Sequence, residues 1–505
     1  MKLQRFVRSE NNRTYSPGLE IEFESRNSEQ DSNFYSIIIG ENGTGKTRIL
    51  EDLVTSFRSG YGIDSPVDSL TGVKINFEDN CPPQKLIYSF FNVYKRKILD
   101  TGFNAGRDIY ISDFKSYNIE TQVAEMYLEN FLQEKPQNET HIFEKSLDKL
   151  TNFLSLDQNP KMSMSGLSGI EYFRLYQLVK KADINSFKDL MAERSDLCQL
   201  DEKGFYENFY KKLKNKNPKK HFEEKYSKYN KSLGEKKLRL FQTVLSIKIM
   251  LIDYRERTQK FQNIKNIYDV QELIQLYKLY YDIEDEKKVK SIIHIDFKIM
   301  KKLKWSYVNN LAFNLGNVTS FKTIDRFSSG EFALFSRVME IAINIKENTL
   351  VLIDEPETYL NPKWVFEFFS LLKDLFCNMN CHFIITSQSP FIVGSAKREE
   401  IIKLKKNQNR IEIVPVQNQT LGAEFNDILM DIFNVSMFDN KIISNYISEL
   451  EKIAKDDIVK SIKMISELAP SANRVGILNQ LLLEENSIAQ IEKALLLTEE
   501  EYFGK

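Results

Sequence analysis

The sequence is poor in the residues that build disulfide frameworks and metal centres. It contains only four cysteines and four histidines among 505 residues. The cysteines Cys81, Cys198, Cys377 and Cys381 are too few and too scattered to cross-link a chain of this length, which indicates reduced thiols. His382 adjoins Cys381, but a zinc knuckle needs a fourth ligand, so buried thiols are the favoured interpretation here.

Long apolar runs and an excess of one charge are missing as well. No stretch long enough to span a bilayer is free of charged residues, and residues 1–16 lack the apolar segment of a signal peptide. We therefore expect a cytoplasmic protein without a membrane partner. Seventy Lys+Arg oppose 71 Asp+Glu, so the total charge does not indicate a polyanionic partner.

The sequence does contain patterns typical of strands and helices, and these lie on both sides of a long helical stretch. Apolar runs predict buried strands at Phe34–Ile39, Thr349–Ile353 and His382–Thr386. Alternation over Leu19–Glu24 predicts a half-buried strand, and Ile401–Val416 resembles a hairpin. The chain exceeds what one core usually supports, so several domains are expected. The predicted division is an α/β lobe at 1–114, a helical insertion at 115–315, a second lobe at 316–420 and a helical region at 421–505.

The insertion carries a basic tract. Lys and Arg outnumber Asp and Glu about two to one over residues 201–240, and aromatic residues directly precede Lys211–Lys220. Two interpretations remain open. The tract is either the solvated tip of a helix pair or a surface that contacts DNA or RNA.

A phosphate-binding loop lies between the first buried strand and a helix. Residues 40–47 read Gly-Glu-Asn-Gly-Thr-Gly-Lys-Thr, a full match to G-x-x-x-x-G-K-[ST]. The glycines let successive N–H groups converge on an anion, and the helix N-terminus adds partial positive charge. We expect the ammonium of Lys46 at the β- and γ-phosphates and the Thr47 hydroxyl on Mg²⁺. The predicted nucleotide contacts are Gly40, Glu41, Asn42, Gly43, Thr44, Gly45, Lys46, Thr47 and Arg48.

Two further motifs are short and polar. Asp354 and Glu355 end an apolar strand, where Asp354 would hold Mg²⁺ through water and Glu355 would act as general base. The alternative is a strand end capped by surface acids. Farther upstream, Ser328 and Glu331 form a capping box that opens a helix, with Ser329 and Gly330 placed to clamp a γ-phosphate.

These motifs, in this order, resemble the ABC-type ATPase heads of the SMC, Rad50, RecF and OLD group. The resemblance covers about residues 1–110 and 315–420, and it continues through Pro356–Pro362, which is similar to the D-E-P-E-x-x-L-H-P block of that group. It implies a P-loop ABC-type head, a mixed sheet flanked by helices, that binds ATP and Mg²⁺. It also implies that two heads face each other across two ATP molecules, so that each signature completes the other's site in a homodimer or a higher homo-oligomer.

The sequence departs from that group at two positions. Asn361 stands where the block usually has histidine, and Gln388 occupies the histidine position of the switch motif T-H-S-P. Glutamine can hydrogen-bond a γ-phosphate but cannot carry a proton, so Gln388 predicts slow ATP hydrolysis. The glutamine-loop residue has no clear candidate, and Tyr15 is a weak candidate for stacking on adenine.

The resemblance leaves several functions open. Transporter subunits have a short interval between the phosphate loop and the signature, whereas here residues 115–315 intervene, an SMC-like arrangement. Residues 421–505 show no nuclease motif, and Gly422–Phe433 is similar to the tail of stand-alone ATPases from Septu-type and retron-associated antiphage systems. That likeness implies a separate HNH-type nuclease as partner, and for retrons a reverse transcriptase with its nucleic acid. The alternatives are a DNA repair ATPase of the RecF or SMC type and a nucleotide-gated scaffold with little turnover.

The C-terminal region carries a marked apolar stripe. Ile443, Tyr446, Ile447 and Leu450 share one helical face, and further leucines follow within 477–497. We expect these helices to dock a partner protein, because any cleavage activity has to be recruited. The alternative is that they cover this chain's own sheet or pair with a second copy.

Overall fold

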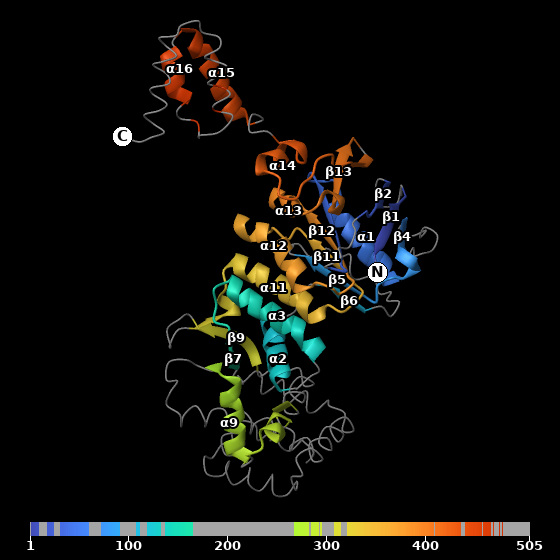
Figure 1. The fold of residues 1–505 in the computed structure, drawn as a ribbon, viewed down its shortest axis with the longest axis vertical. Coiled ribbons are helices and arrows are strands. Elements are labelled where there is room, and N and C mark those ends of the chain that lie inside the picture. The colour runs from blue at the N-terminus through green and yellow to red at the C-terminus, as the bar shows by residue number, and fades with distance from the viewer. Residues whose placement is uncertain are drawn as a thin grey trace, which may run out of the picture. The chain divides into compact units, whose positions relative to one another are not determined.

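The structure is a computed structural model, in which the chain forms two compact units, Met1–Leu421 and Gly422–Lys505 (Figure 1). The residues that the structure describes are 2–9, 18–24, 31–59, 72–90, 108–111, 119–132, 137–164, 267–281, 284–291, 293–294, 308–314, 321–408, 410–435, 440–456, 458–465, 468, 474 and 477.

A seven-stranded sheet is the centre of the first unit. Its neighbouring strands are parallel except for the hairpin at one edge, and the predicted α/β class is thereby confirmed. Its three middle strands, the ones expected from apolar runs, are buried along almost their whole length, as parallel strands covered on both faces are. In order across the sheet the strands are β14 (Arg410–Val414), β13 (Ile401–Asn407), β3 (Phe34–Gly40), β12 (His382–Ser387), β11 (Thr349–Asp354), β5 (Lys85–Phe90) and β6 (Asp108–Ile111).

One face of this sheet packs on helix α1 (Lys46–Ser59), which a second, smaller sheet covers on its other side. That antiparallel sheet has the order β2 (Leu19–Glu22), β1 (Leu3–Arg8) and β4 (Val73–Phe77). In β2 the leucine and isoleucine point inward and the two glutamates outward, as the alternation predicts. A single apolar core joins both sheets to α1, so the helix that follows the phosphate loop is held from two sides.

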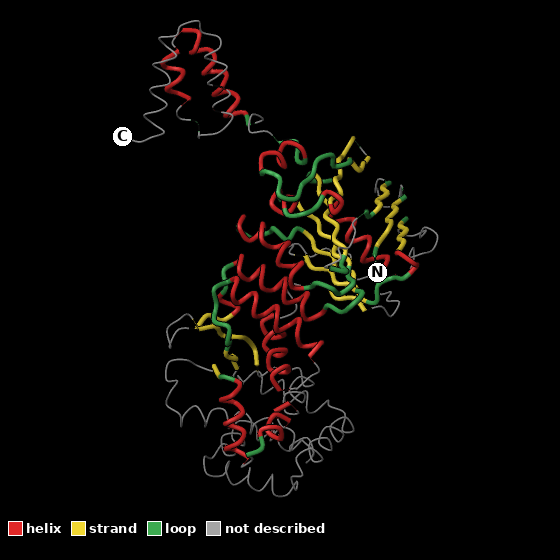
Figure 2. Tube along the Cα trace, viewed as in Figure 1, coloured by secondary structure: helices red, strands yellow, loops and turns green. Residues whose placement is uncertain are grey.

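The opposite face is covered by helices, as Figure 2 shows. Tyr35 of β3 packs edge-on against Phe369, and Phe376 stacks on Phe383 of β12. Helix α11 is buried over most of its length, because its apolar residues are distributed around most of its circumference. These helices are α11 (Ser329–Asn344) and α12 (Pro362–Leu375), and α3 (Gln137–Phe153) packs against both of them. The short α13 (Pro390–Gly394) and the turns η1 (Glu78–Asn80), η3 (Ile324–Arg326) and η4 (Arg398–Glu400) lie elsewhere in the unit.

The predicted insertion at 115–315 is not purely helical, which corrects the sequence-based expectation. Its described residues include helices α2 (Ile119–Leu132) and α9 (Val270–Tyr281), but also strands in a four-stranded antiparallel sheet. These strands come from distant parts of the chain, and their pairing, rather than a local pattern, makes them strands. The sheet has the order β10 (Phe321–Thr323), β9 (Val308–Asn314), β7 (Lys161–Met164) and β8 (Ile267–Tyr268).

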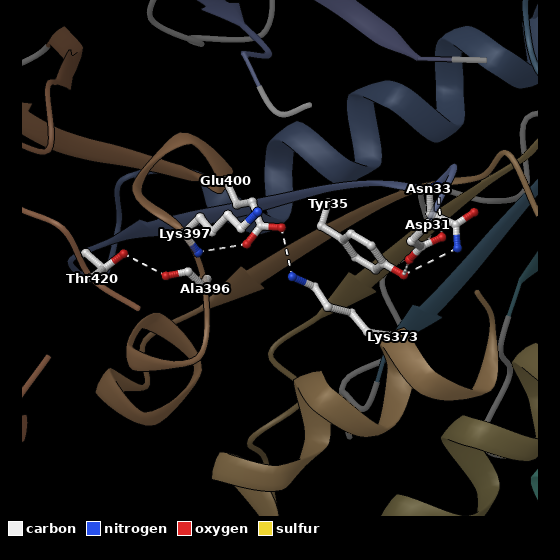
Figure 3. Close-up of polar contacts among 8 residues, drawn as sticks. All are labelled: Asp31, Asn33, Tyr35, Lys373, Ala396, Lys397, Glu400 and Thr420. Atoms are coloured by element: carbon white, nitrogen blue, oxygen red, sulfur yellow. Dashed lines mark hydrogen bonds and ion pairs between the residues drawn. The ribbon is translucent and has the colours of Figure 1, made fainter. Parts of the chain in front are cut away.

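Buried polar side chains fill the space beside the amino end of β3 (Figure 3). Tyr35 donates its hydroxyl to Asp31, and Asn33 donates to the Tyr35 oxygen. Burial raises the pKa of the Tyr35 hydroxyl, so it stays protonated. The ammonium of Lys373 lies over the Tyr35 ring at 4.8 Å and donates to Glu400 at 2.8 Å, which ties α12 to the segment before β13.

Asn33 itself is bonded on both sides of its amide. Its oxygen accepts the N–H groups of Met379 and Cys381, and its nitrogen donates to the carbonyl of Phe376 at 2.5 Å. The side chain therefore satisfies the main chain of the turn between α12 and β12, which would otherwise hold buried, unpaired groups.

His382 is the other polar group at the amino ends. Its Nδ1 accepts the N–H of Leu3 at 3.0 Å and its Nε2 lies 2.9 Å from the Ser36 hydroxyl, while the Phe23 and Phe34 rings pack around it. Because Nδ1 accepts, the proton sits on Nε2 and is donated to Ser36. Burial, together with the positive charge of nearby Lys2, lowers the pKa of His382 to about 3. The ring is thus a neutral link between the two sheets.

The second unit contains α14 (Phe425–Asp431), α15 (Lys441–Asp456) and α16 (Ile458–Ile465). Helices α15 and α16 pack on each other: the Tyr446 hydroxyl donates to the carbonyl of Met464, and Ser461 donates to that of Leu450. Leu450, part of the expected stripe, is fully buried. Among the described residues of the whole chain, no helix is long and apolar enough to cross a bilayer.

Candidate functional site

The phosphate loop folds as a tight turn between β3 and α1. A Cβ added to Gly40 would lie 2.7 Å from the carbonyl oxygen of Leu404 and 2.8 Å from the Thr44 hydroxyl, so only glycine fits there. Gly43 and Gly45 have φ of +84° and +83°, in the left-handed region that favours glycine. The Thr44 hydroxyl and N–H both bond to the carbonyl of Glu41, which closes the turn. Residues 41–43 are exposed, so the rim of the loop is accessible.

Lys46 is buried at the start of α1. Its ammonium donates to the carbonyl oxygens of Gly40 at 2.8 Å and Glu41 at 3.4 Å, across the mouth of the loop. Burial lowers the pKa of Lys46, and the negative charges of Glu355 and Glu357 partly offset that effect. A cation held in this way, at the N-terminus of α1, is placed to neutralise a phosphate.

The acid at the end of β11 faces the loop. Thr47 donates its hydroxyl to Oδ1 of Asp354 at 3.1 Å, and Thr386 donates to the same oxygen at 2.6 Å. A hydroxyl and a carboxylate held together are the oxygen ligands that Mg²⁺ prefers. The residues therefore fit the metal that the sequence predicts, for which Thr47 and Asp354 are the expected ligands.

Gln388 and Glu355 meet as well. The side-chain amide of Gln388 donates to Oε1 of Glu355, and its backbone N–H donates to Oε1 of Glu357 at 2.6 Å. Ser387 donates to that same oxygen of Glu357 at 3.0 Å. Glu355 has φ of +44°, an uncommon conformation for a residue other than glycine, asparagine or aspartate. The carboxylate expected to act as base is thus oriented by a neutral amide group.

A fully buried arginine lies beneath this segment. Arg337 of α11 donates to the carbonyl of Pro356 at 2.6 Å, and burial lowers its pKa to about 10 against the charges of Glu357 and Glu340. Burial likewise raises the pKa of Glu357. From the sequence, Arg337 had no assigned role, and Glu357 was placed in the block Pro356–Pro362 without a role of its own. A usable signal was present, since an arginine amid the apolar positions of a buried helix needs a partner.

The signature segment forms the predicted capping box. Ser328 accepts the N–H of Glu331 at 3.3 Å, and the Glu331 carboxylate accepts the N–H of Ser328 at 2.6 Å. Although burial acts to raise the pKa of Glu331, hydrogen bonds from Lys322 and Ser328 outweigh it and lower that pKa. Ser329 is exposed, and a Cβ at Gly330 would lie 2.9 Å from the carbonyl oxygen of Tyr359. The start of α11 is therefore packed on the segment after β11, with its serines at the surface.

Arg48, an expected nucleotide contact, is directed elsewhere. Its Nε lies 3.0 Å from Asp52, which Arg8 of β1 also contacts at 3.0 Å. Burial raises the pKa of Asp52 even though both guanidinium groups act to lower it. The side chain of Arg48 thus forms an ion pair within α1, while Arg8 ties α1 to the small sheet through Asp52. The backbone N–H of Arg48 stays at the helix N-terminus.

Some expected residues lie outside the part of the chain that the structure describes. These are Tyr15, the tract Lys211–Lys220 and most of 471–505. Within the described residues, no group of three or more His, Cys, Asp or Glu could hold a metal ion by itself. The expected Mg²⁺ ligands Thr47 and Asp354 are one hydroxyl and one carboxylate, so they do not form a group of that kind.

Comparison with known proteins adds three findings. A family model described as "AAA domain, putative AbiEii toxin, Type IV TA system" matches residues 36–394. A stretch of 112 residues is 27% identical to Protein ea59 of Escherichia phage lambda and covers 22% of this chain and 21% of that relative. The match thus spans about a fifth of the relative's length.

Three solved SMC heads are similar to this chain only at TM-scores below 0.3. The head of Pyrococcus furiosus Smc, bound to the C-terminal domain of ScpA, is 11% identical over 82% of this chain and 95% of that one, with a TM-score of 0.27. The Pyrococcus yayanosii head is 14% identical over 82% and 97%, also at 0.27. The Thermotoga maritima SMC head is 20% identical over 21% and 40%, at 0.18.

Proposed function

The chain belongs to the AAA-domain family whose description names the putative AbiEii toxin of type IV toxin–antitoxin systems, and from this premise we propose that it is an ATP-binding and ATP-hydrolysing subunit of an antiphage defence complex. In this proposal, ATP-dependent pairing of two heads controls a separate nuclease. The family description and the resemblance to stand-alone defence ATPases support the defence role.

One observation carries the nucleotide site. Lys46, Thr47, Asp354 and Glu355 converge where β3, β11 and β12 end, although the chain separates the first two from the last two by about three hundred residues. Ligands of open α/β sheets bind at the carboxyl ends of the strands, and this is the polar, charged edge of the sheet. ATP is the substrate that a phosphate loop and a paired acid fit.

Each side chain has a definite task in the proposed reaction. The loop N–H groups and Lys46 bind the β- and γ-phosphates, and Thr47 and Asp354 hold Mg²⁺, which neutralises phosphate charge when it is bound. Glu355 accepts the proton of the attacking water, and Gln388 orients Glu355. Because an amide cannot take up or release that proton, we expect slow turnover.

The proposed dimer follows from the signature. Ser328 and Ser329 are exposed at the N-terminus of α11, where a capped helix end favours an anion. In a head-to-head dimer this end meets the γ-phosphate held by the second copy.

We propose two kinds of partner, a protein and a nucleic acid. An HNH-type nuclease, with a reverse transcriptase and its nucleic acid in a retron setting, is the expected partner. The stripe Ile443–Leu450 packs on α16 in the second unit, which favours self-packing for that part. We therefore propose that 471–505 docks the partner protein. Lys211–Lys220 stays the candidate contact for DNA or RNA.

Two other functions remain as alternatives. A repair ATPase of the RecF or SMC type would use the same site, and a nucleotide-gated scaffold would bind ATP with little turnover. The contact between Gln388 and Glu355 is the observation that favours the scaffold as the second candidate.

Sedimentation with ATP and Mg²⁺ tests the dimer. We expect Glu355→Gln to accumulate ATP-bound dimers, because binding persists while water activation is lost. Lys46→Ala is the matched control and stays monomeric, since it lacks the phosphate-binding cation. Monomers in both variants at saturating ATP would contradict head pairing.

Co-purification tests the proposed docking of a partner. We expect the full chain to capture the product of the neighbouring gene and a chain without 471–505 to lose it.

A further inference from the structure

Thr386 is a buried hydroxyl that the sequence motifs do not single out. It lies on β12 at the register position of Asp354 on β11, and the four residues before it on the strand are His382, Phe383, Ile384 and Ile385. Its side chain is fully buried. A polar group at such a position needs a reason, because burying a hydroxyl is unfavourable unless it is hydrogen-bonded.

The hydroxyl of Thr386 has two partners, and both belong to the proposed site. It donates to Oδ1 of Asp354 at 2.6 Å and accepts the backbone N–H of Glu355 at 3.2 Å. The carbonyl of Thr386 lies 3.1 Å from that same N–H. One residue of β12 therefore contacts both acids at the end of β11.

These contacts restrict both acids. Oδ1 of Asp354 accepts two hydroxyls, from Thr386 on one side and from Thr47 on α1 on the other. Two donors on one oxygen fix the plane of the carboxylate. Glu355 has φ of +44°, a conformation that persists only where surrounding bonds hold it, and its N–H is bonded to Thr386.

We propose that Thr386 is a positioning residue of this site, whose hydroxyl orients the Asp354 carboxylate for Mg²⁺ and anchors the backbone of Glu355. The inference rests on the proposed ATP site. Groups that hydrogen-bond to a metal-holding carboxylate set its orientation, and their loss typically weakens metal binding 10- to 100-fold.

The chain offers a matched control. Thr349 lies at the other end of β11, is also fully buried, and also uses its hydroxyl twice. It donates to the carbonyl of Lys346 at 2.8 Å and accepts the N–H of Lys346 at 3.2 Å. Thr349→Val and Thr386→Val thus each remove one bond that the hydroxyl donates and one that it accepts, in the same sheet, and only the second substitution touches the acids.

Binding of a fluorescent ATP analogue, titrated with Mg²⁺ and repeated in EDTA, tests the proposal. We expect Thr386→Val to raise the Mg²⁺ concentration for half-maximal binding by about tenfold, with the affinity in EDTA unchanged. Thr386→Ser keeps the hydroxyl and restores the Mg²⁺ dependence of the unmodified chain. Thr349→Val leaves that dependence unchanged while lowering the thermal midpoint. Thr386→Ala gives the same Mg²⁺ shift and serves if the valine variant is insoluble.

Two outcomes would overturn the proposal and can be told apart. An unmodified chain that binds no ATP removes the proposed function and this inference with it. Normal, Mg²⁺-dependent binding by the unmodified chain together with an unshifted Thr386→Val, or an equal shift in Thr349→Val, removes the positioning role alone.

Discussion

The two ends of strands β3, β11 and β12 are both polar and both largely buried, yet they use their polar groups differently. At the amino ends, Asn33 and His382 bond to main-chain and side-chain groups of neighbouring segments. At the carboxyl ends, Lys46, Asp354 and Glu355 gather charges of both signs beside an exposed loop. The same strands thus have hydrogen-bonded, neutral polar groups at their amino ends and a charged site at their carboxyl ends.

The difference separates stability from function. A neutral amide or imidazole that satisfies buried N–H groups holds the fold together and offers nothing to a ligand. A cluster of charges at an uncommon backbone conformation, such as Glu355 at φ +44°, stores strain at a place where a ligand has access. We therefore expect substitutions at the carboxyl ends to change chemistry and those at the amino ends to change stability.

The largest effect is expected for Glu355→Gln at the carboxyl ends. Loss of the proton-accepting oxygen should lower ATP hydrolysis by about 10²- to 10⁴-fold, with ATP affinity retained within about twofold. Phosphate release and equilibrium binding measure the two quantities. A variant that keeps more than a tenth of the rate would show that another group activates the water.

Asn33→Ala should reverse the pattern at the amino ends. It leaves the N–H groups of Met379 and Cys381 buried without their acceptor, so the free energy of unfolding should fall by about 3 kcal/mol. Urea denaturation measures the loss, and ATP affinity of the folded variant should be unchanged. A clear loss of affinity at unchanged stability would break the proposed separation of the two ends.

His382 gives the amino ends a dependence on pH. Its pKa is about 3 in the folded chain and ordinary, near 6.5, in the unfolded one, so the unfolded state binds the extra proton between these values. The contribution of the neutral His382 to the free energy of unfolding is complete above pH 6.5. Below that pH it decreases by about 1.4 kcal/mol per pH unit. The slope of unfolding free energy between pH 4.5 and 6.5 should be smaller in His382→Gln. Equal slopes in both chains would assign the pH dependence to other groups.

A smaller effect is expected for Gln388→His. This substitution introduces the histidine that is usual at this position in the SMC, Rad50, RecF and OLD group, which the sequence resembles. The imidazole can still bond to Glu355 and adds a titratable proton, so hydrolysis should change by only a few-fold but acquire a pH midpoint near 6.5. Gln388→Ala, which leaves Glu355 unoriented, should instead be about tenfold slower at every pH. A pH profile identical to that of the unmodified chain would show that the residue at position 388 takes no part in the proton transfer.

Contiguous features were the ones that the sequence predicted well. The strands at Phe34–Ile39 and His382–Thr386 each extend by one residue in the structure, and the capping box of Ser328 and Glu331 is confirmed. Each depends on neighbours along the chain, where turn and cap chemistry act. The roles assigned to the nucleotide-contacting residues stay predictions.

Features that depend on distant pairing were not predictable in this way. Thr386 meets Asp354 only because β12 lies beside β11, and Arg337 meets Pro356 only because α11 covers the same strands. The strands within 115–315 likewise exist through pairing between residues about 150 positions apart. A pattern read along the chain carries no information about which strand becomes the neighbour.

Equilibrium titration of ATP into the unmodified chain and into Lys46→Ala, with Mg²⁺ present, tests the central claim most directly. We expect the unmodified chain to bind ATP and the variant to bind it at least about 100-fold more weakly, because the phosphate charge loses the cation held at Gly40 and Glu41. The thermal midpoint without ATP serves as the check that the variant is folded. Equal ATP affinity in the two folded chains would contradict a nucleotide site at the carboxyl ends of these strands.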